Sequence, residues 1–97
     1  MAGITTHVLD TAKGRPAAGV PVTLRFEDEV VFEGVTDNDG RAKLVAESQR
    51  GTYRLTFANP GGFFPEITIV FRIEETAQHY HVPLLLAPFG YSTYRGS

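Results

Sequence analysis

Apolar and polar residues alternate along most of the chain, in short runs that turn-forming residues separate. In the run GVPVTLRF (residues 19–26), the apolar side chains of Val20, Val22, Leu24 and Phe26 share one face of an extended chain. About eight such runs are expected to form strands, at residues 4–9, 19–26, 30–35, 41–47, 52–57, 66–73, 79–87 and 90–96. Short strands at this spacing are typical of an antiparallel sandwich or barrel.

The segments between these runs are rich in turn formers. TDNDG (residues 36–40) combines Asp and Asn, which can cap their own backbone, with a glycine that tolerates positive φ. NPGG (residues 59–62) and KGRP (residues 13–16) are further turns. The only helical candidate, EETAQ (residues 74–78), is long enough for one turn. The pattern therefore predicts an all-β protein.

One strand, HYHVPLLLA at residues 79–87, breaks the simple alternation. If the core-facing residues are Tyr80, Val82, Leu84 and Leu86, the side chains that face away are those of His79, His81, Pro83 and Leu85. A strand that is apolar on both faces is usually covered on both. We expect another subunit or a ligand to cover the outer face, and an exposed leucine without function is the alternative.

Composition removes several classes of protein. The length of 97 residues suits one domain (residues 1–97), with 42% hydrophobic and 21% charged residues. The net charge of −2 comes from interspersed charges, so no nucleic-acid partner is expected. No apolar run approaches the ~18 residues of a membrane span, so no membrane partner is expected either. There is no cysteine, which excludes disulfides and thiolate chemistry but leaves the redox compartment undecided. The first residues lack the pattern of a signal peptide, so a cytoplasmic location is expected.

Three histidines are the candidates for chemistry. His79 and His81 are two residues apart, so on a strand both imidazoles lie on one face, about 7 Å apart. That spacing allows a shared metal with His7 as a third ligand, a shared site without metal, or unrelated surface histidines. Arg41 directly follows the TDNDG turn and begins a strand. The nucleophile-elbow, P-loop and dinucleotide motifs are absent.

Five motifs together resemble the transthyretin-related family of 5-hydroxyisourate hydrolases over nearly the whole chain. They are HVLD, GRPAAGVPVTL, TDNDGR, FFPEI and HYHVPLLLAPFGYSTYRGS. Residues 79–97 are the most specific, because a terminal Tyr-Arg-Gly-Ser distinguishes the hydrolases from the thyroid-hormone carrier transthyretin, which shares the fold.

The resemblance implies a transthyretin-like sandwich of two four-stranded sheets. Dimers that join edge to edge would pack face to face into a homotetramer, with active sites at the dimer–dimer interface. The implied reaction is hydrolysis of 5-hydroxyisourate to 2-oxo-4-hydroxy-4-carboxy-5-ureidoimidazoline in urate degradation. The resemblance implies neither a metal nor an organic cofactor.

Matching the family motifs to this chain gives a set of expected site residues. The catalytic set is His7, Arg41, His81 and Ser97. The substrate-binding set is Arg41, Tyr94 and His79, with His79 behind the groups that react. Histidine suits activation of water near neutral pH, and arginine suits an oxyanion or a planar substrate. Either His81 or His7 could be the base, and Ser97 could act through its hydroxyl or its terminal carboxylate.

Two other functions and two structural differences accompany this expectation. The alternatives are a non-catalytic carrier of transthyretin type and a zinc-dependent cyclic amidohydrolase that uses the same histidines. The family has a longer segment with a short helix where this chain has only ANPGG (residues 58–62), and the hairpin FEDEVVFEG (residues 26–34) is also short. We therefore predict an almost helix-free sandwich.

Overall fold

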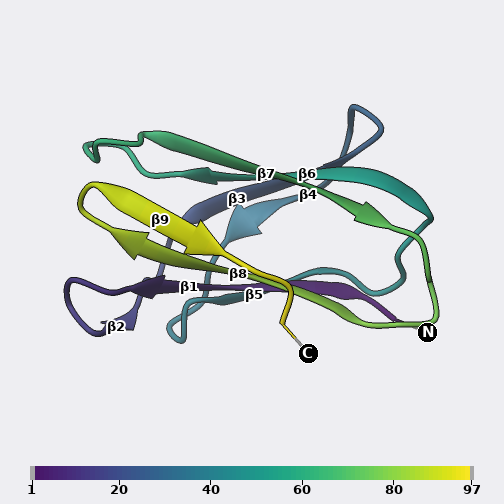
Figure 1. Cartoon of the computed structure of the whole chain (residues 1–97), viewed down its shortest axis with the longest axis horizontal. Helices are drawn as coiled ribbons and strands as arrows, with labels where there is room; N and C mark the ends of the chain where they lie inside the picture. The colour runs from purple at the N-terminus through teal and green to yellow at the C-terminus, as the bar shows by residue number, and fades with distance from the viewer. Residues whose placement is uncertain (1, 97) are drawn as a thin grey trace.

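Two β-sheets lie face to face in the computed structural model, which describes residues 2–96 (Figure 1). Its strands are β1 (Ile4–Asp10), β2 (Arg15–Pro16), β3 (Pro21–Phe26), β4 (Glu29–Val35), β5 (Arg41–Val45), β6 (Gly51–Ala58), β7 (Glu66–Ile73), β8 (Tyr80–Ala87) and β9 (Gly90–Thr93). One sheet has the order β2-β1-β8-β9, with β5 also paired to β1, and the other has the order β4-β3-β6-β7. The pair β1–β8 is parallel, and the other paired strands are antiparallel. This is the predicted all-β sandwich.

The core lies between the two sheets and follows the predicted alternation. On β6, Tyr53, Leu55 and Phe57 are buried, while the residues between them face outward. The Tyr53 ring lies 4.8 Å from that of Phe26 and 5.6 Å from that of Phe71, measured between centroids. Side chains from both sheets form one hydrophobic cluster. Where one face of a strand is buried, as on β6, the burial fixes the strand register.

The structure has one strand more than the sequence pattern predicted. The KGRP turn contains β2, which pairs with the end of β1 and makes that sheet five-stranded rather than four-stranded. The cause is a tight reversal after β1, in which Asp10 Oδ1 accepts hydrogen bonds from the backbone N–H groups of Ala12 and Lys13 at 3.0 and 3.1 Å. Gly14 completes the reversal with a φ of 68°.

The prediction of an almost helix-free sandwich is confirmed for residues 2–96, which contain no helix. After β6 the chain turns at once, because the backbone N–H of Gly62 donates to Asn59 O at 3.0 Å and that of Asn59 donates to Pro65 O at 2.8 Å. This tight turn leaves no room for the short helix. Within the same residues, nothing helical has the length and apolar character needed to cross a membrane.

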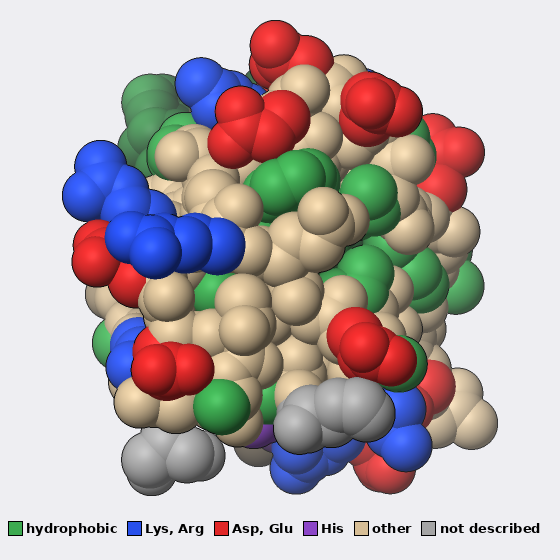
Figure 2. All heavy atoms as spheres, turned by 90° about the vertical axis from the view of Figure 1, so that its right-hand side faces the viewer, with side chains coloured by type: hydrophobic (Ala, Val, Ile, Leu, Met, Phe, Trp, Pro, Cys, Tyr) green, Lys and Arg blue, Asp and Glu red, His purple; other side chains and the backbone are tan. Residues whose placement is uncertain are grey.

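One end of the sandwich carries charges of both signs. Figure 2 shows acidic and basic side chains interspersed there around small apolar areas. This is the end where the connection between β7 and β8 runs (Figure 1). The mixture agrees with the interspersed charges of the sequence.

Candidate active site

Four of the expected site residues lie on the outer face of the five-stranded sheet, where β1 lies between β5 and β8, namely His7, Arg41, His79 and His81. Alternate residues of β1, such as Ile4 and Val8, are buried in the core, so the odd-numbered residues of this strand face away from it. The register places His7 opposite Arg41 on β5 and opposite Pro83 on β8. Two residues earlier, Thr5 lies opposite Lys43 and His81.

The turn before β5 determines where Arg41 begins its strand. The carboxylate of Asp37 accepts hydrogen bonds from the backbone N–H groups of Asp39 at 2.8 Å and Arg41 at 3.0 Å. The bond from Arg41 is the main cause that lowers the pKa of Asp37. A further bond, from the backbone N–H of Val8 to Gly40 O at 2.7 Å, fastens this turn to β1. The predicted TDNDG turn is therefore confirmed.

This turn also orients His7. Its Nε2 lies 2.8 Å from the backbone oxygen of Asp39. A carbonyl oxygen only accepts hydrogen bonds, so Nε2 carries the proton and donates it. In the neutral form of His7, Nδ1 is then the unprotonated nitrogen. The geometry thus assigns one tautomer to His7.

Gly40 is the tightest point of the turn, and we predict that Gly40→Ala lowers the free energy of unfolding by about 2–4 kcal/mol. Its φ is +76°, and an added Cβ would lie 2.5 Å from Val8 O and 3.0 Å from Pro16 Cβ. Urea unfolding measures the loss. Gly61→Ala is the matched control, because Gly61 also has a positive φ, +87°, but nothing lies within 4 Å of its added Cβ. A loss of about 1–2 kcal/mol is expected there, and equal losses in the two variants would contradict the close contact at Gly40.

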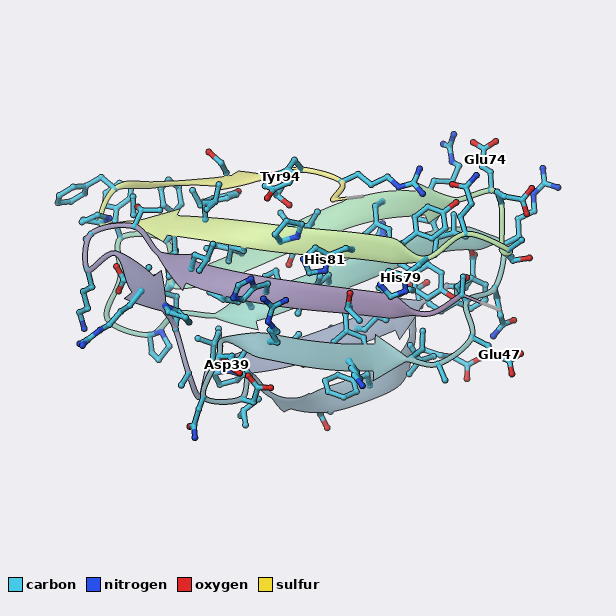
Figure 3. All side chains as sticks on the ribbon, turned by 90° about the horizontal axis from the view of Figure 1, so that it is seen from below. Asp39, Glu47, Glu74, His79, His81 and Tyr94 are labelled. Carbon is cyan, nitrogen blue, oxygen red and sulfur yellow. The ribbon has the colours of Figure 1, made fainter. Side chains whose placement is uncertain are left out.

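His79 and His81 are brought together by the hydroxyl of Thr5. Thr5 Oγ1 lies 2.8 Å from Nδ1 of His81 and 3.0 Å from Nε2 of His79. Figure 3 shows the two labelled histidines near each other on the face formed by β1 and β8. Because a hydroxyl has one proton, Thr5 can donate to at most one of these nitrogens, so at least one of the two histidines donates to Thr5. The histidines are therefore linked through a third residue.

The surroundings of His81 favour its neutral form. Its side chain is half-buried, whereas that of His79 is exposed. Burial is the main cause that lowers the pKa of His81 below its ordinary value of 6.5, and the nearby positive charges of His7, Arg41 and His79 lower it further. At neutral pH this imidazole is unprotonated at one nitrogen and can accept a proton.

The chain after β9 returns to His81. Pro83 has no backbone N–H, and the β8–β9 ladder ends beside it, at the pair Leu84–Thr93. The backbone N–H of Gly96 then donates to His81 O at 2.7 Å. A Cβ on Gly96 would lie 2.7 Å from Cδ2 of His81, so the glycine lets the backbone lie against the imidazole. The final strand is thus shorter than predicted, and Gly96, which follows it, packs against His81.

Four of the expected residues line two different cavities, and His7 lines neither of them. A cavity of about 620 Å³ is lined by Thr5, Arg41, Lys43, His79 and His81, among others. His7 lies next to Arg41 on the same face. Tyr94 is 56% exposed and lines a different cavity, of about 460 Å³, near the edges of β7 and β9. Arg95 also lines that second cavity, and its guanidinium lies 4.3 Å from the centre of the Tyr80 ring. Ser97 lies outside the described residues.

Thr5 and Lys43 are among the residues of this site that were not expected from the sequence. Thr5 and Lys43 line the same cavity as Arg41 and His81. The only signal for Thr5 was its position two residues before His7, which puts both on one face of a strand. Among residues 2–96, no group of three or more His, Cys, Asp or Glu side chains is close enough together to hold a metal ion.

Several curated relatives match almost all of the chain. A 5-hydroxyisourate hydrolase of Caulobacter vibrioides is 44% identical over 100% of both proteins, and one of Deinococcus radiodurans is 46% identical over 98% of this chain and 96% of the relative. The uric acid degradation bifunctional protein TTL of Arabidopsis thaliana is 44% identical over 97% of this chain, which spans only 37% of that protein.

Solved structures agree with these relatives. A 5-hydroxyisourate hydrolase of Klebsiella pneumoniae has a TM-score of 0.90 and 38% identity, with 100% of both chains covered. Sea bream transthyretin in complex with thyroxine has a TM-score of 0.89 and 28% identity, covering 98% of this chain and 95% of the other. The sequence model of the HIUase/Transthyretin family matches residues 4–96. The chain therefore belongs to the HIUase/Transthyretin family.

Proposed function

We propose that this protein hydrolyses 5-hydroxyisourate to 2-oxo-4-hydroxy-4-carboxy-5-ureidoimidazoline in urate degradation. Its full-length relatives carry the name of that activity. The proposal rests on one observation, that His81 and Arg41 line the same cavity. The pKa of His81 is lowered, and Arg41 bears a guanidinium group. In the hydrolysis of a cyclic amide, a neutral imidazole can activate water and a fixed cation can stabilise the oxyanion.

In the proposed mechanism His81 is the base. Its unprotonated nitrogen takes a proton from water, and the water oxygen attacks a ring carbonyl of the substrate. Negative charge develops on the carbonyl oxygen, and Arg41 stabilises it with paired N–H donors. The carbon–nitrogen bond of the ring then breaks, and the proton passes from His81 to the leaving nitrogen. The carboxylic acid that forms loses the second proton of the water to solvent and becomes a carboxylate. His7, with Nδ1 unprotonated, supports this step as a hydrogen-bond acceptor beside Arg41.

We propose roles for three further residues. His79 supports His81 through Thr5, and its position in the cavity is compatible with a contact to substrate. Tyr94 lines the other cavity. It would bind substrate only by contributing to a site that another subunit forms. Ser97 is proposed to position the attacking water or the base.

We also propose the homotetramer. Its support is the outer face of β8, where Leu85 and His81 are half-buried in a single chain, and the edge strands β7 and β9, which end their sheets. Sedimentation equilibrium tests this assembly. We also propose a single domain over residues 1–97, because side chains from both sheets form one core cluster. A cytoplasmic location is part of the same proposal. Cell fractionation tests the location.

One assay tests the activity against both alternatives. Urate and a urate oxidase generate 5-hydroxyisourate in the cuvette, and its absorbance is followed with and without this protein. We expect faster decay than the spontaneous reaction, unchanged by a chelator. Decay at the spontaneous rate would contradict the hydrolase. Loss of activity with chelator and recovery with zinc would support the metal-dependent alternative, whereas binding without turnover would support the carrier.

The pH dependence of kcat/KM provides a prediction about His81. Protonation removes the base, so kcat/KM falls as the pH falls through the pKa of His81. Burial lowers that pKa, so we expect the acid limb to lie below 6.5. Positive charge on His7, Arg41 and His79 contributes to that lowering, and the charged residues Asp37 and Lys43 also line the cavity. The profile is measured between pH 5 and 8 after subtraction of spontaneous decay at each pH. An acid limb at or above the ordinary histidine value would contradict this role.

A further inference from the structure

The hydroxyl of Thr5 is a single-proton link between a half-buried imidazole and an exposed one. Its distances to Nδ1 of His81 and Nε2 of His79, 2.8 and 3.0 Å, are both within hydrogen-bond range. With the Thr5 proton in one of the two bonds, two proton arrangements satisfy both of them. Either His81 donates to Thr5 and Thr5 donates to His79, or His79 donates to Thr5 and Thr5 donates to His81.

The two arrangements leave different nitrogens of His81 free. In the first, Nδ1 of His81 carries a proton and Nε2 holds the unshared electron pair that a base needs. In the second, Nδ1 is unprotonated but occupied by Thr5, so the neutral ring has its proton on Nε2. Only the first arrangement gives a base that can accept a proton from water, because Nδ1 is engaged by Thr5 in both.

We propose that Thr5 is a positioning residue, which holds His81 in the Nδ1-protonated tautomer and connects it to His79 as a proton relay. This inference rests on the proposed role of His81 as base. Thr5 and His81 lie directly opposite each other in the parallel β1–β8 ladder, so the backbone fixes their separation. A short chain of hydrogen bonds held by two paired strands is well suited to select a tautomer.

The proton count of the relay balances. When Nε2 of His81 takes a proton from water, the Nδ1 proton moves to Oγ1 of Thr5 and the hydroxyl proton moves to Nε2 of His79. The positive charge then lies on the exposed imidazole of His79 rather than on the half-buried one. Water solvates a charge better on an exposed side chain than on a buried one. When His81 gives its Nε2 proton to the leaving nitrogen, the same protons return along the chain.

Two substitutions at position 5 separate this role from a structural one. Thr5→Val keeps the shape and β-branching of threonine but removes the hydroxyl, whereas Thr5→Ser keeps the hydroxyl. We expect Thr5→Val to lower kcat about 10- to 100-fold with little change in KM, less than the ~10²–10⁴-fold contribution of a whole base. Thr5→Ser should restore kcat to within a few-fold of the unmodified protein.

Thr68→Val is the matched control for removing a threonine hydroxyl. Thr68 is exposed on β7, in the other sheet, where its Oγ1 lies 3.0 Å from that of Thr56. We expect its kcat and KM to equal those of the unmodified protein. Thermal unfolding of all variants shows which of them are folded.

The tautomer itself is read by ¹⁵N NMR of the imidazoles in the substrate-free protein, a measurement that needs no activity. We expect a proton on Nδ1 of neutral His81 in the unmodified protein and a shift toward the Nε2-protonated form in Thr5→Val. An Nε2 proton in the unmodified protein would overturn the inference, and so would an unchanged tautomer and kcat in folded Thr5→Val. If the unmodified protein fails to hydrolyse 5-hydroxyisourate, the proposed function fails, and the relay as a catalytic device fails with it. The NMR spectrum still decides whether Thr5 sets the tautomer.

Discussion

Replacing His81 by glutamine is expected to lower kcat/KM by about 10²- to 10⁴-fold, the contribution of one positioned base. Glutamine can keep a hydrogen bond to Thr5, but its amide cannot take a proton from water. The loss should appear in kcat, because the substrate can still bind in a cavity that keeps Arg41 and Lys43. Steady-state kinetics on freshly generated 5-hydroxyisourate measure the effect.

The matched comparison for this variant is His79→Gln. His79 is exposed and reaches His81 only through Thr5, so its loss should cost less than that of His81. His7→Gln completes the set, because either His81 or His7 could be the base on sequence grounds. If His81→Gln keeps more than a tenth of the activity while His7→Gln loses nearly all of it, the base is His7 and the assignment made here is wrong.

Much of the fold could be predicted because core residues tend to occupy every second position of a strand. Tyr53, Leu55 and Phe57 are buried as the alternation predicted, since only one face of β6 meets the other sheet. The strand β2 could not be predicted in this way. Its two residues are both exposed and have no alternation, and they pair with β1 because the reversal capped by Asp10 brings them back.

The site was only partly predictable for a related reason. The family motifs marked His7, Arg41 and His81, but the part played by Thr5 depends on the register between β1 and β8. A threonine in a strand is ordinary, because β-branched residues are enriched there. Nothing in its neighbours along the chain indicates that two histidines more than 70 positions away will share its hydroxyl.

Tyr94 matches the family motif, but its side chain does not line the same cavity as Arg41 and His81. It stands beside residues that return to His81, yet its side chain lines the other cavity, at the edges of β7 and β9. The regular ladder between β8 and β9 ends next to Pro83, so strand alternation no longer tells which way later side chains point. The proposed role of Ser97, outside the described residues, stays a prediction.

Replacing Arg41 by lysine is expected to lower kcat/KM about 10²- to 10³-fold, the usual cost of losing an oxyanion donor. Lysine keeps the charge but not the planar fork of donors that can hold two oxygens. The turn should survive, because the backbone N–H of residue 41, not its side chain, donates to Asp37. Urea unfolding checks this, and steady-state kinetics give kcat and KM separately.

Arg54→Lys is the control, since Arg54 is exposed on β6 in the other sheet, and we expect it to leave both constants unchanged. The division of the Arg41→Lys effect distinguishes the two roles proposed for Arg41. Equal losses in kcat and kcat/KM indicate an interaction made only in the transition state, as for an oxyanion donor. A raised KM with constant kcat indicates a clamp on the substrate instead. Full activity with lysine would mean that positive charge alone is sufficient, and the paired-donor role of Arg41 would then have to be abandoned.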